Sequence, residues 1–381
     1  MNVDTVSDFL AEQRDEAPEE LQPLIIQFED YWERKLWHQL TDALLEFFSH
    51  PGSAKQRLQF YKVFILKFAD KINQLKLVDL GLNAATQCRD NQERLTFLTD
   101  LAKKVDNENS QDAFVYATVA VARVRLDLRD VEGARRDLDG AERTLEAFDS
   151  VETKVHAAFY RVNADYYQAR ADFASYYRNA LLYLACVELP ALDPRERRER
   201  AYNLGIAALV SDSIYNFGEL LQHPILEALA GTEHAWLRDL LVAFNRGDLA
   251  AYDVLRGHVD RHPLLSDHDD EIRQKIYLAA LTESVFRRPP HERAMTFAAI
   301  SADTKVRKTE IEHLVMKALS LGLVRGTIDE VAELVNFTWV QPRVLDLAQI
   351  AGMAQRLGDW GENVNKLGNW IEATGQDIWA P

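Results

Sequence analysis

Apolar residues recur at helical spacing over most of the chain, from Leu21 to Phe286. In each stretch they gather on one face and leave polar residues on the other, which is the pattern of an amphipathic helix. Connections of about two to six residues separate the stretches, and short links make consecutive helices antiparallel neighbours. The pattern predicts helices over residues 19–33, 36–49, 54–72, 75–88, 92–105, 112–128, 131–148, 151–170, 173–187, 194–210, 217–229, 233–245, 249–259 and 269–286.

Helix pairs that follow one another in sequence can stack, so that each pair buries its apolar face against the next. The stretch ADFASYYRNALLYL has small alanines where helices would approach and aromatic residues that would fill gaps, as in tetratricopeptide-like (TPR-like) packing. No strict period of about 34 residues emerges, so the repeats are degenerate. The fold class predicted for residues 1–270 is therefore mostly α, a right-handed α-solenoid of TPR-like antiparallel helix pairs.

The hydrophobic period changes over residues 287–347. Two short helices are predicted there, over residues 295–301 and 308–321. Thr309 and the glutamate three residues later fit a capping box near the start of the second helix. Gly322 follows its last apolar residue and is expected to end it.

Alternating apolar and polar residues come next, over residues 323–328 and 335–340, and Pro342 ends the pattern because proline cannot donate to a sheet ladder. Helices followed by a two-stranded hairpin make a winged helix, which we predict over residues 271–347. Unpaired strand edges of such a wing can extend the sheet of a neighbouring protein. The predicted partner interface at the wing edge comprises Val324, Thr327, Ile328, Asn336, Thr338 and Val340.

The last segment, residues 348–381, carries a heptad pattern, with residues alternately three and four apart from Ile350 to Ile378 and only Thr374 not apolar. Glycines interrupt it, and each costs a helix about 1 kcal/mol relative to alanine. We therefore predict a C-terminal helix that orders when its seam packs in a bundle with other helices, the alternative being that it packs on its own winged helix. The predicted partner interface comprises Met353, Leu357, Trp360, Val364, Leu367, Ile371 and Ile378.

Composition narrows the function classes. The net charge of −16 disfavours a general binder of nucleic acid or of anionic membranes. The two cysteines, Cys88 and Cys186, are too few for a disulfide framework and fit a reducing compartment. The acidic first residues lack an apolar signal core, and no apolar run is long enough to span a membrane. We expect a cytoplasmic and nuclear protein.

No arrangement of residues typical of an enzyme is present, and no cofactor is expected. His258 and His262 share a helix face and are the best metal candidates, but the carboxylate between them points to another face, so an exposed helix end is the favoured interpretation. Cys186 lies in an apolar stretch, where a free cysteine usually acts as a small hydrophobe. The tyrosine pairs at 166–167 and 176–177 could line a peptide groove, but packing between helices explains them better.

A winged helix raises the question of nucleic-acid binding. Residues 287–325 hold eight basic side chains, so this region is basic in an acidic chain. Glu310 and Glu312 fall in the first turns of the helix that would read bases, where they would face phosphates. Direct reading of DNA or RNA is therefore disfavoured, although it stays an alternative.

A helical solenoid that leads directly into a winged helix resembles the PCI domain, a module shared by the proteasome lid, the COP9 signalosome and a translation initiation factor complex. The stretches LVMKALSLGLVRGTIDEV and TWVQPRVLDL look like the PCI core of the family of the lid's ninth regulatory non-ATPase subunit. KLWHQLT, ASYYRNALLYL, NFGELLQHPILEAL and AFNRGD also resemble that family. The likeness covers about residues 32–353.

The resemblance implies a non-catalytic scaffold subunit of the proteasome regulatory-particle lid, which supports ubiquitin-dependent protein degradation. In such subunits the winged helices pack edge to edge and the C-terminal helices gather in one bundle. The partners it implies are the other PCI lid subunits and the lid deubiquitinase subunits, with the ubiquitin receptor of the regulatory particle as a further candidate. A PCI scaffold of a signalosome-like complex and a winged-helix nucleic-acid binder are the alternatives.

Overall fold

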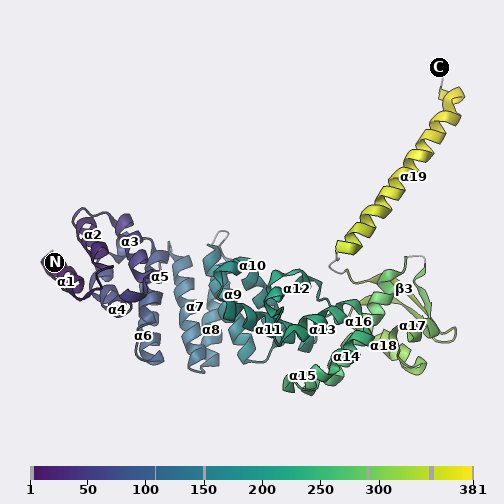
Figure 1. Cartoon of the computed structure of the whole chain (residues 1–381), viewed down its shortest axis with the longest axis horizontal. Helices are drawn as coiled ribbons and strands as arrows, with labels where there is room; N and C mark the ends of the chain where they lie inside the picture. Colours follow the sequence, from purple (N-terminus) through teal and green to yellow (C-terminus); the bar gives the residue numbers. More distant parts are fainter. Residues whose placement is uncertain (1–3, 108, 149–151, 290–291, 343–346, 380–381) are drawn as a thin grey trace. The chain divides into compact units, whose positions relative to one another are not determined.

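The computed structural model describes residues 4–379 except 108, 149–151, 290–291 and 343–346. The chain divides into two compact units, Met1–Leu192 and Asp193–Pro381. The first unit is helical in its described part, and the described strands lie in the second (Figure 1). This division falls well before residue 270, so the helices between the two positions share a unit with the winged helix. The predicted boundaries at residues 270 and 347 stay predictions.

The first unit is a stack of helices in which neighbours in sequence pack on each other (Figure 1). Its core is apolar, and Tyr166, Tyr176 and Tyr177 lie buried between helices, as predicted for packing residues. The pattern of α8 shows why these helices form, because Ala134 and Leu138 recur at helical spacing and are buried. Its regular helices are α1 (Asp4–Glu16), α2 (Gln22–Glu33), α3 (Trp37–Ser49), α5 (Gln74–Ala85), α6 (Asn91–Val105), α7 (Gln111–Asp127), α8 (Val131–Glu146), α9 (Thr153–Ala169) and α10 (Phe173–Cys186).

One predicted helix, over residues 54–72, is wrong. Phe60, Phe64 and Phe68 are each almost completely buried, and the ring centroids of Phe64 and Phe68 lie 5.3 and 5.8 Å from that of Trp32. Packing of these large rings overrides the local helical preference of the segment. The backbone is divided into α4 (Arg57–Gln59), a π-helical turn (Phe60–Phe64) and two 3₁₀ turns (Ile65–Lys67 and Ala69–Lys71).

The second unit starts with helices of the same kind. The helix predicted over residues 217–229 is divided in two at Pro224, which lacks a backbone N–H to continue it. The other predicted helices of this unit's first part are present with small shifts at their ends. The helices are α11 (Pro194–Val210), α12 (Gly218–Gln222), a 3₁₀ helix (Pro224–Leu229), α13 (Ala235–Arg246), α14 (Leu249–Val259), α15 (Pro263–Asp267) and α16 (Asp269–Arg287).

Lys275 on α16 caps the C-terminal end of α11. Its Nζ donates to the carbonyl oxygens of Ala208 and Ser211, each at 2.7 Å, and of Leu209 at 3.1 Å. The last carbonyls of a helix have no partner within it, and a cation also complements the helix dipole there. Burial lowers the pKa of Lys275 to about 7. The Lys275 side chain thus links α16 to the end of α11. Later residues of α16 belong to the winged-helix core.

The predicted two-stranded hairpin of the wing is present, and the structure adds a third strand that the sequence did not predict. Strand β1 (Ala294–Thr296) pairs antiparallel with β3 (Leu334–Val340), which also pairs with β2 (Val324–Asp329), giving the order β1-β3-β2. Met295, predicted to begin a helix, instead lies opposite Val335, and both side chains are buried. The helix that follows is α17 (Phe297–Thr304).

The second winged-helix helix is α18 (Ile311–Ser320), preceded by a 3₁₀ turn (Lys308–Glu310). The capping box predicted at Thr309 is wrong, because Glu310 occupies the N-cap position and makes no side-chain cap hydrogen bond. The end of the helix is as predicted. Gly322 has a left-handed φ of 69°, and the N–H of Leu323 donates to the carbonyl of Ala318 at 3.0 Å.

Candidate functional site

The side chains considered for catalysis or metal binding have structural roles. The His258 ring stacks on Trp236 with centroids 5.4 Å apart, and Nδ1 of His262 accepts the N–H of Leu265 at 3.4 Å. Within the described parts of the chain, no group of three or more His, Cys, Asp or Glu side chains could hold a metal ion. Burial raises the pKa of the Cys88 and Cys186 thiols, which disfavours the nucleophilic thiolate.

The basic side chains of the winged helix are mostly engaged within the chain. Ion pairs join Arg287 to Glu283, Arg288 to Asp303, Arg307 to Glu310 and Lys308 to Glu333. The Arg325 guanidinium lies 4.8 Å from the centre of the Trp339 ring. Nucleic-acid binding requires cations that are free to contact phosphates. The geometry therefore does not favour binding of nucleic acid by the winged helix. A separate finding is that no described helix is long and apolar enough to cross a membrane.

Fewer of the predicted interface residues lie on an edge strand of the sheet than the sequence predicts. Strand β3 is central, so Asn336 faces Ala294 on one side and Thr327 on the other instead of lying at an edge. The longer edge strand is β2. The Val324 side chain is 0% exposed, so the prediction that it offers a contact is wrong for its side chain, although its backbone belongs to the edge strand.

The other predicted wing residues divide between the two faces of the sheet. Ile328 and Val340 are partly buried and pack against the winged-helix core, whereas Thr327, Asn336 and Thr338 are exposed. Successive side chains of a strand alternate between its two faces, and the unpaired Thr338 shifts this alternation in β3, so that Val340 lies on the core face opposite to Asn336. The polar members therefore define an outward face, and the apolar members stabilise the wing from beneath.

A β-bulge in β3, at Thr338, lies opposite Arg325 and Gly326 of the edge strand β2. The register shifts between Arg325 and Gly326, and the Thr338 hydroxyl donates to the carbonyl of Arg325 at 3.2 Å. A Cβ at Gly326 would lie 2.3 Å from the carbonyl oxygen of Asn336, so only glycine fits without a shift of the backbone. The conformation of β2 therefore depends on this glycine.

The C-terminal helix is α19 (Leu347–Trp379) (Figure 1), and its predicted heptad seam is exposed. The described apolar side chains of the seam are 44 to 67% exposed. Burying a large apolar side chain contributes about 1.5–3 kcal/mol, so the exposed stripe leaves a large apolar area that packing against another helix would stabilise. The side chain of Ile378 lies outside the described residues. The described members of the predicted interface are Met353, Leu357, Trp360, Val364, Leu367 and Ile371.

The two flanks of the seam differ in size. On one flank Ala354, Gly361 and Gly368 recur every seven residues, each directly after a seam residue. Small residues at this spacing let a second helix approach closely, as alanine and glycine do in tightly packed helix pairs. On the other flank, the Trp370 side chain is 63% exposed. The apolar face of α19 is therefore wider than the heptad seam alone, with small residues along one side of the seam and Trp370 on the other.

Comparison with known proteins gives the same architecture. Residues 24–241 match the family model of the PSD13 N-terminal repeats, residues 249–339 that of the PCI domain, and residues 343–375 that of the Rpn9 C-terminal helix. The chain is 45% identical over 373 residues to the probable 26S proteasome regulatory subunit rpn9 of Schizosaccharomyces pombe, an alignment that covers 98% of this chain and 97% of that protein. The chain belongs to the Rpn9/PSD13 family of 26S proteasome regulatory subunits.

Two further relatives extend the likeness across distant organisms. The 26S proteasome regulatory subunit RPN9 of Saccharomyces cerevisiae is 40% identical over 391 aligned positions, with 99% of this chain and 98% of that protein covered. The 26S proteasome non-ATPase regulatory subunit 13 of Dictyostelium discoideum is 35% identical, with 94% and 95% covered. The chain is therefore a non-ATPase regulatory subunit, as the resemblance implied.

Membership of the Rpn9/PSD13 family corrects the extent of the resemblance. The likeness predicted over residues 32–353 continues through the tail, because the C-terminal helix is itself a family element. Sequence reasoning also missed Trp370 and the small flank of α19. Both could have been found by writing out all seven heptad positions, since Gly361 and Gly368 fall at one position and Trp370 at another.

Proposed function

We propose that this chain is a scaffold subunit of the proteasome lid that holds its neighbours through two surfaces, the edge strand β2 and the seam of α19. The observation that carries the proposal is the exposed apolar stripe of α19, which is long, regular and separate from the winged-helix core. Helical bundles bury such seams by packing knobs into holes.

The edge strand has a different role in this proposal. Main-chain hydrogen bonds along β2 would extend the sheet of a neighbouring PCI subunit and fix the orientation of the two winged helices. The lid deubiquitinase subunits are the proposed partners of the α19 seam, and the ubiquitin receptor is the proposed neighbour of the helical repeats. As part of the proteasome, the chain is expected in the cytoplasm and the nucleus.

The alternatives have less support. A signalosome-like assembly is disfavoured because the relatives that align over nearly the whole chain are named as 26S proteasome subunits. A nucleic-acid reader is disfavoured because four of the eight basic side chains over residues 287–325 form ion pairs within the chain.

Truncation after Gln355 tests the proposal. The shortened chain should keep the helical content and thermal unfolding of both units, because the seam contributes nothing to their cores. It should nevertheless be depleted from purified lid by tenfold or more when it competes with the full chain. Equal incorporation of the truncated and full chains would contradict the proposed role of α19.

A further inference from the structure

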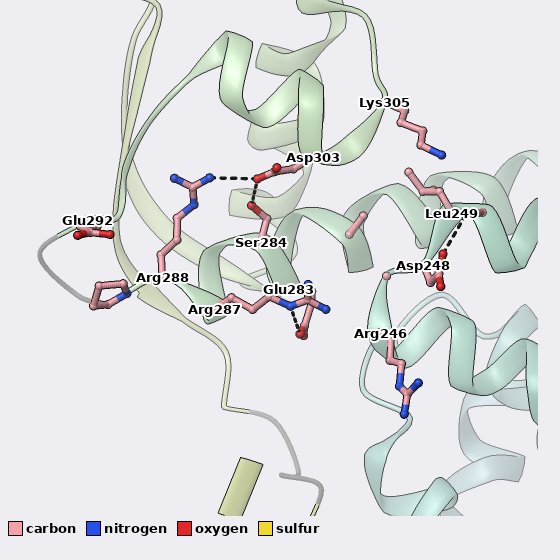
Figure 2. A pocket seen from close by; sticks show the side chains of 14 residues that line it. Arg246, Asp248, Leu249, Glu283, Ser284, Arg287, Arg288, Glu292, Asp303 and Lys305 are labelled. Carbon is pink, nitrogen blue, oxygen red and sulfur yellow. Dashed lines mark hydrogen bonds and ion pairs between the residues drawn. The ribbon is translucent and has the colours of Figure 1, made fainter. Parts of the chain in front are cut away.

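A charged groove lies in the second unit, apart from the two surfaces proposed for assembly. It has a volume of about 690 Å³ and is formed by the α13–α14 turn, the last turns of α16 and the end of α17 (Figure 2). Neither β2 nor α19 contributes a residue to its lining. A partner held here would therefore be additional to those of the proposed assembly surfaces.

The floor of the groove is made of small residues. Gly247, Ala250 and Ala280 line it, and a Cβ at Gly247 would lie 2.6 Å from the Cα of Ala280. The α13–α14 turn therefore packs closely against α16. Gly247 adopts a left-handed φ of 64°, and Oδ1 of Asp248 accepts the N–H groups of Ala250 and Ala251 at 3.0 and 3.1 Å. These small residues leave room in the groove for a polypeptide backbone.

Most charges that line the groove are already engaged. Arg287 donates to Glu283 at 2.9 Å, and Asp303 accepts from both Arg288 and Ser284, at 3.2 and 2.5 Å (Figure 2). Asp248 is held by its capping role at the start of α14. The ion pairs neutralise Glu283 and Asp303, whereas the Asp248 carboxylate keeps its charge.

Two cations differ from the rest. Arg246 and Lys305 are exposed, and no ion pair or hydrogen bond joins either side chain to another described residue. In Figure 2 both lie at the end of the groove where Leu249 lies, and Glu292 lies at the opposite end. Lys305 has a left-handed φ of 55° at the end of α17, a conformation that a residue with a side chain seldom adopts. The fold thus holds an unpaired cation over the groove at a conformational cost.

We propose that this groove binds an extended acidic segment of a partner protein. The backbone of the segment would lie across the small floor, and its carboxylates would pair with Arg246 and Lys305. Exposed ion pairs are individually weak, so the isolated segment should bind loosely and with a strong dependence on salt. Within an assembled complex, the high effective concentration would make the contact persistent.

Fluorescence polarisation with the full-length chain tests this proposal. The probe is a fluorescein-labelled ten-residue peptide of alternating glutamate and glycine, compared with the same design containing serine or lysine, at low salt. The acidic peptide should bind at least tenfold more tightly than the serine peptide, although the chain carries a net charge of −16. The double variant R246Q/K305Q should remove this difference.

The matched control is K62Q/K317Q, which removes two exposed cations that do not line the groove. It should bind the acidic peptide as the unmodified chain does. Equal binding of acidic and serine peptides, or equal weakening by the two double variants, would overturn the proposal. Stronger competition by a short RNA than by an excess of unlabelled acidic peptide would also overturn it, because the groove would then be a general polyanion site.

Discussion

The winged helix buries its apolar side chains in a core of its own, whereas the C-terminal helix α19 leaves its apolar side chains exposed. The winged helix is complete by itself, with Met295, Val324, Val335 and Phe337 in a closed core and polar side chains on its outer sheet face. Helix α19 has almost no buried side chain among those described and exposes its apolar stripe. If the proposed assembly surfaces are right, affinity for neighbours should come mainly from α19, whereas β2 should fix orientation through directional hydrogen bonds.

The largest expected effect comes from charging the seam. The triple variant L357D/V364D/L367D should lower incorporation into the lid by more than tenfold, because each buried carboxylate would lose its water without gaining a partner. The control Q355D/N365D/N369D adds the same charge on the outer faces of α19 and should incorporate normally. Quantitative mass spectrometry of purified lid measures both, and equal depletion of the two variants would show that charge, not the seam, is responsible.

The next effect separates helix stability from close approach. Gly361→Leu with Gly368→Leu should stabilise α19 as an isolated helix, since glycine is the weaker helix former by about 1 kcal/mol. It should nevertheless reduce incorporation by about tenfold, because the small flank would be filled. Gly352→Ala with Gly358→Ala stabilises the same helix on other faces and should leave incorporation unchanged. If both pairs improve incorporation, helix propensity limits assembly and close packing does not.

A smaller effect is expected in the wing. Gly326→Ala should destabilise the second unit by about 1–3 kcal/mol, because the new methyl group would overlap the carbonyl of Asn336. Incorporation should fall only a few-fold at a temperature where the unit stays folded. Thermal unfolding measures the stability change. The control is Gly140→Ala on α8, where a Cβ meets nothing within 4 Å and should be neutral or stabilising.

The last expected effect concerns how the stability of the second unit depends on pH, which leaves both proposed assembly surfaces unchanged. Burial lowers the pKa of Lys275 from its ordinary 10.5 to about 7, so between these values the unfolded chain holds a proton that the folded chain has released. The free energy of unfolding should therefore rise with pH across this window, by at most about 1.4 kcal/mol per pH unit. Urea unfolding at several pH values should show that Lys275→Met removes this slope and, by leaving carbonyls without a donor, destabilises the unit by about 1–3 kcal/mol. An unchanged slope would assign the pH dependence to other groups.

The two regions also differ in how well the sequence predicts them. The heptad spacing of α19 and the glycine that ends α18 are local signals, and both predictions were confirmed by the structure. Strand β1 was missed because only Met295 of its three residues is buried, and its pairing partner lies far along the chain. A pattern within three residues cannot distinguish such a strand from the start of a helix.

The wing residues and the groove show a second limit. Whether Val324 points inward depends on the sheet register and on the bulge beside Gly326, neither of which alternation of residue types reveals. Arg246 and Lys305 are distant in sequence and line the same groove only because α13, α16 and α17 pack together. Features that depend on the local residue pattern were therefore predictable from the sequence, whereas side-chain positions that depend on tertiary packing were not.

Hydrogen–deuterium exchange of α19, measured in the isolated chain and in the assembled proteasome, tests the central claim most directly. A helix that depends on partners should exchange within seconds when the chain is alone, because its glycines leave it marginal and its seam is uncovered. The same amides should be strongly protected in the assembly. Full protection of α19 in the isolated monomer, or no gain in protection on assembly, would contradict the proposal that this helix buries its seam against other subunits.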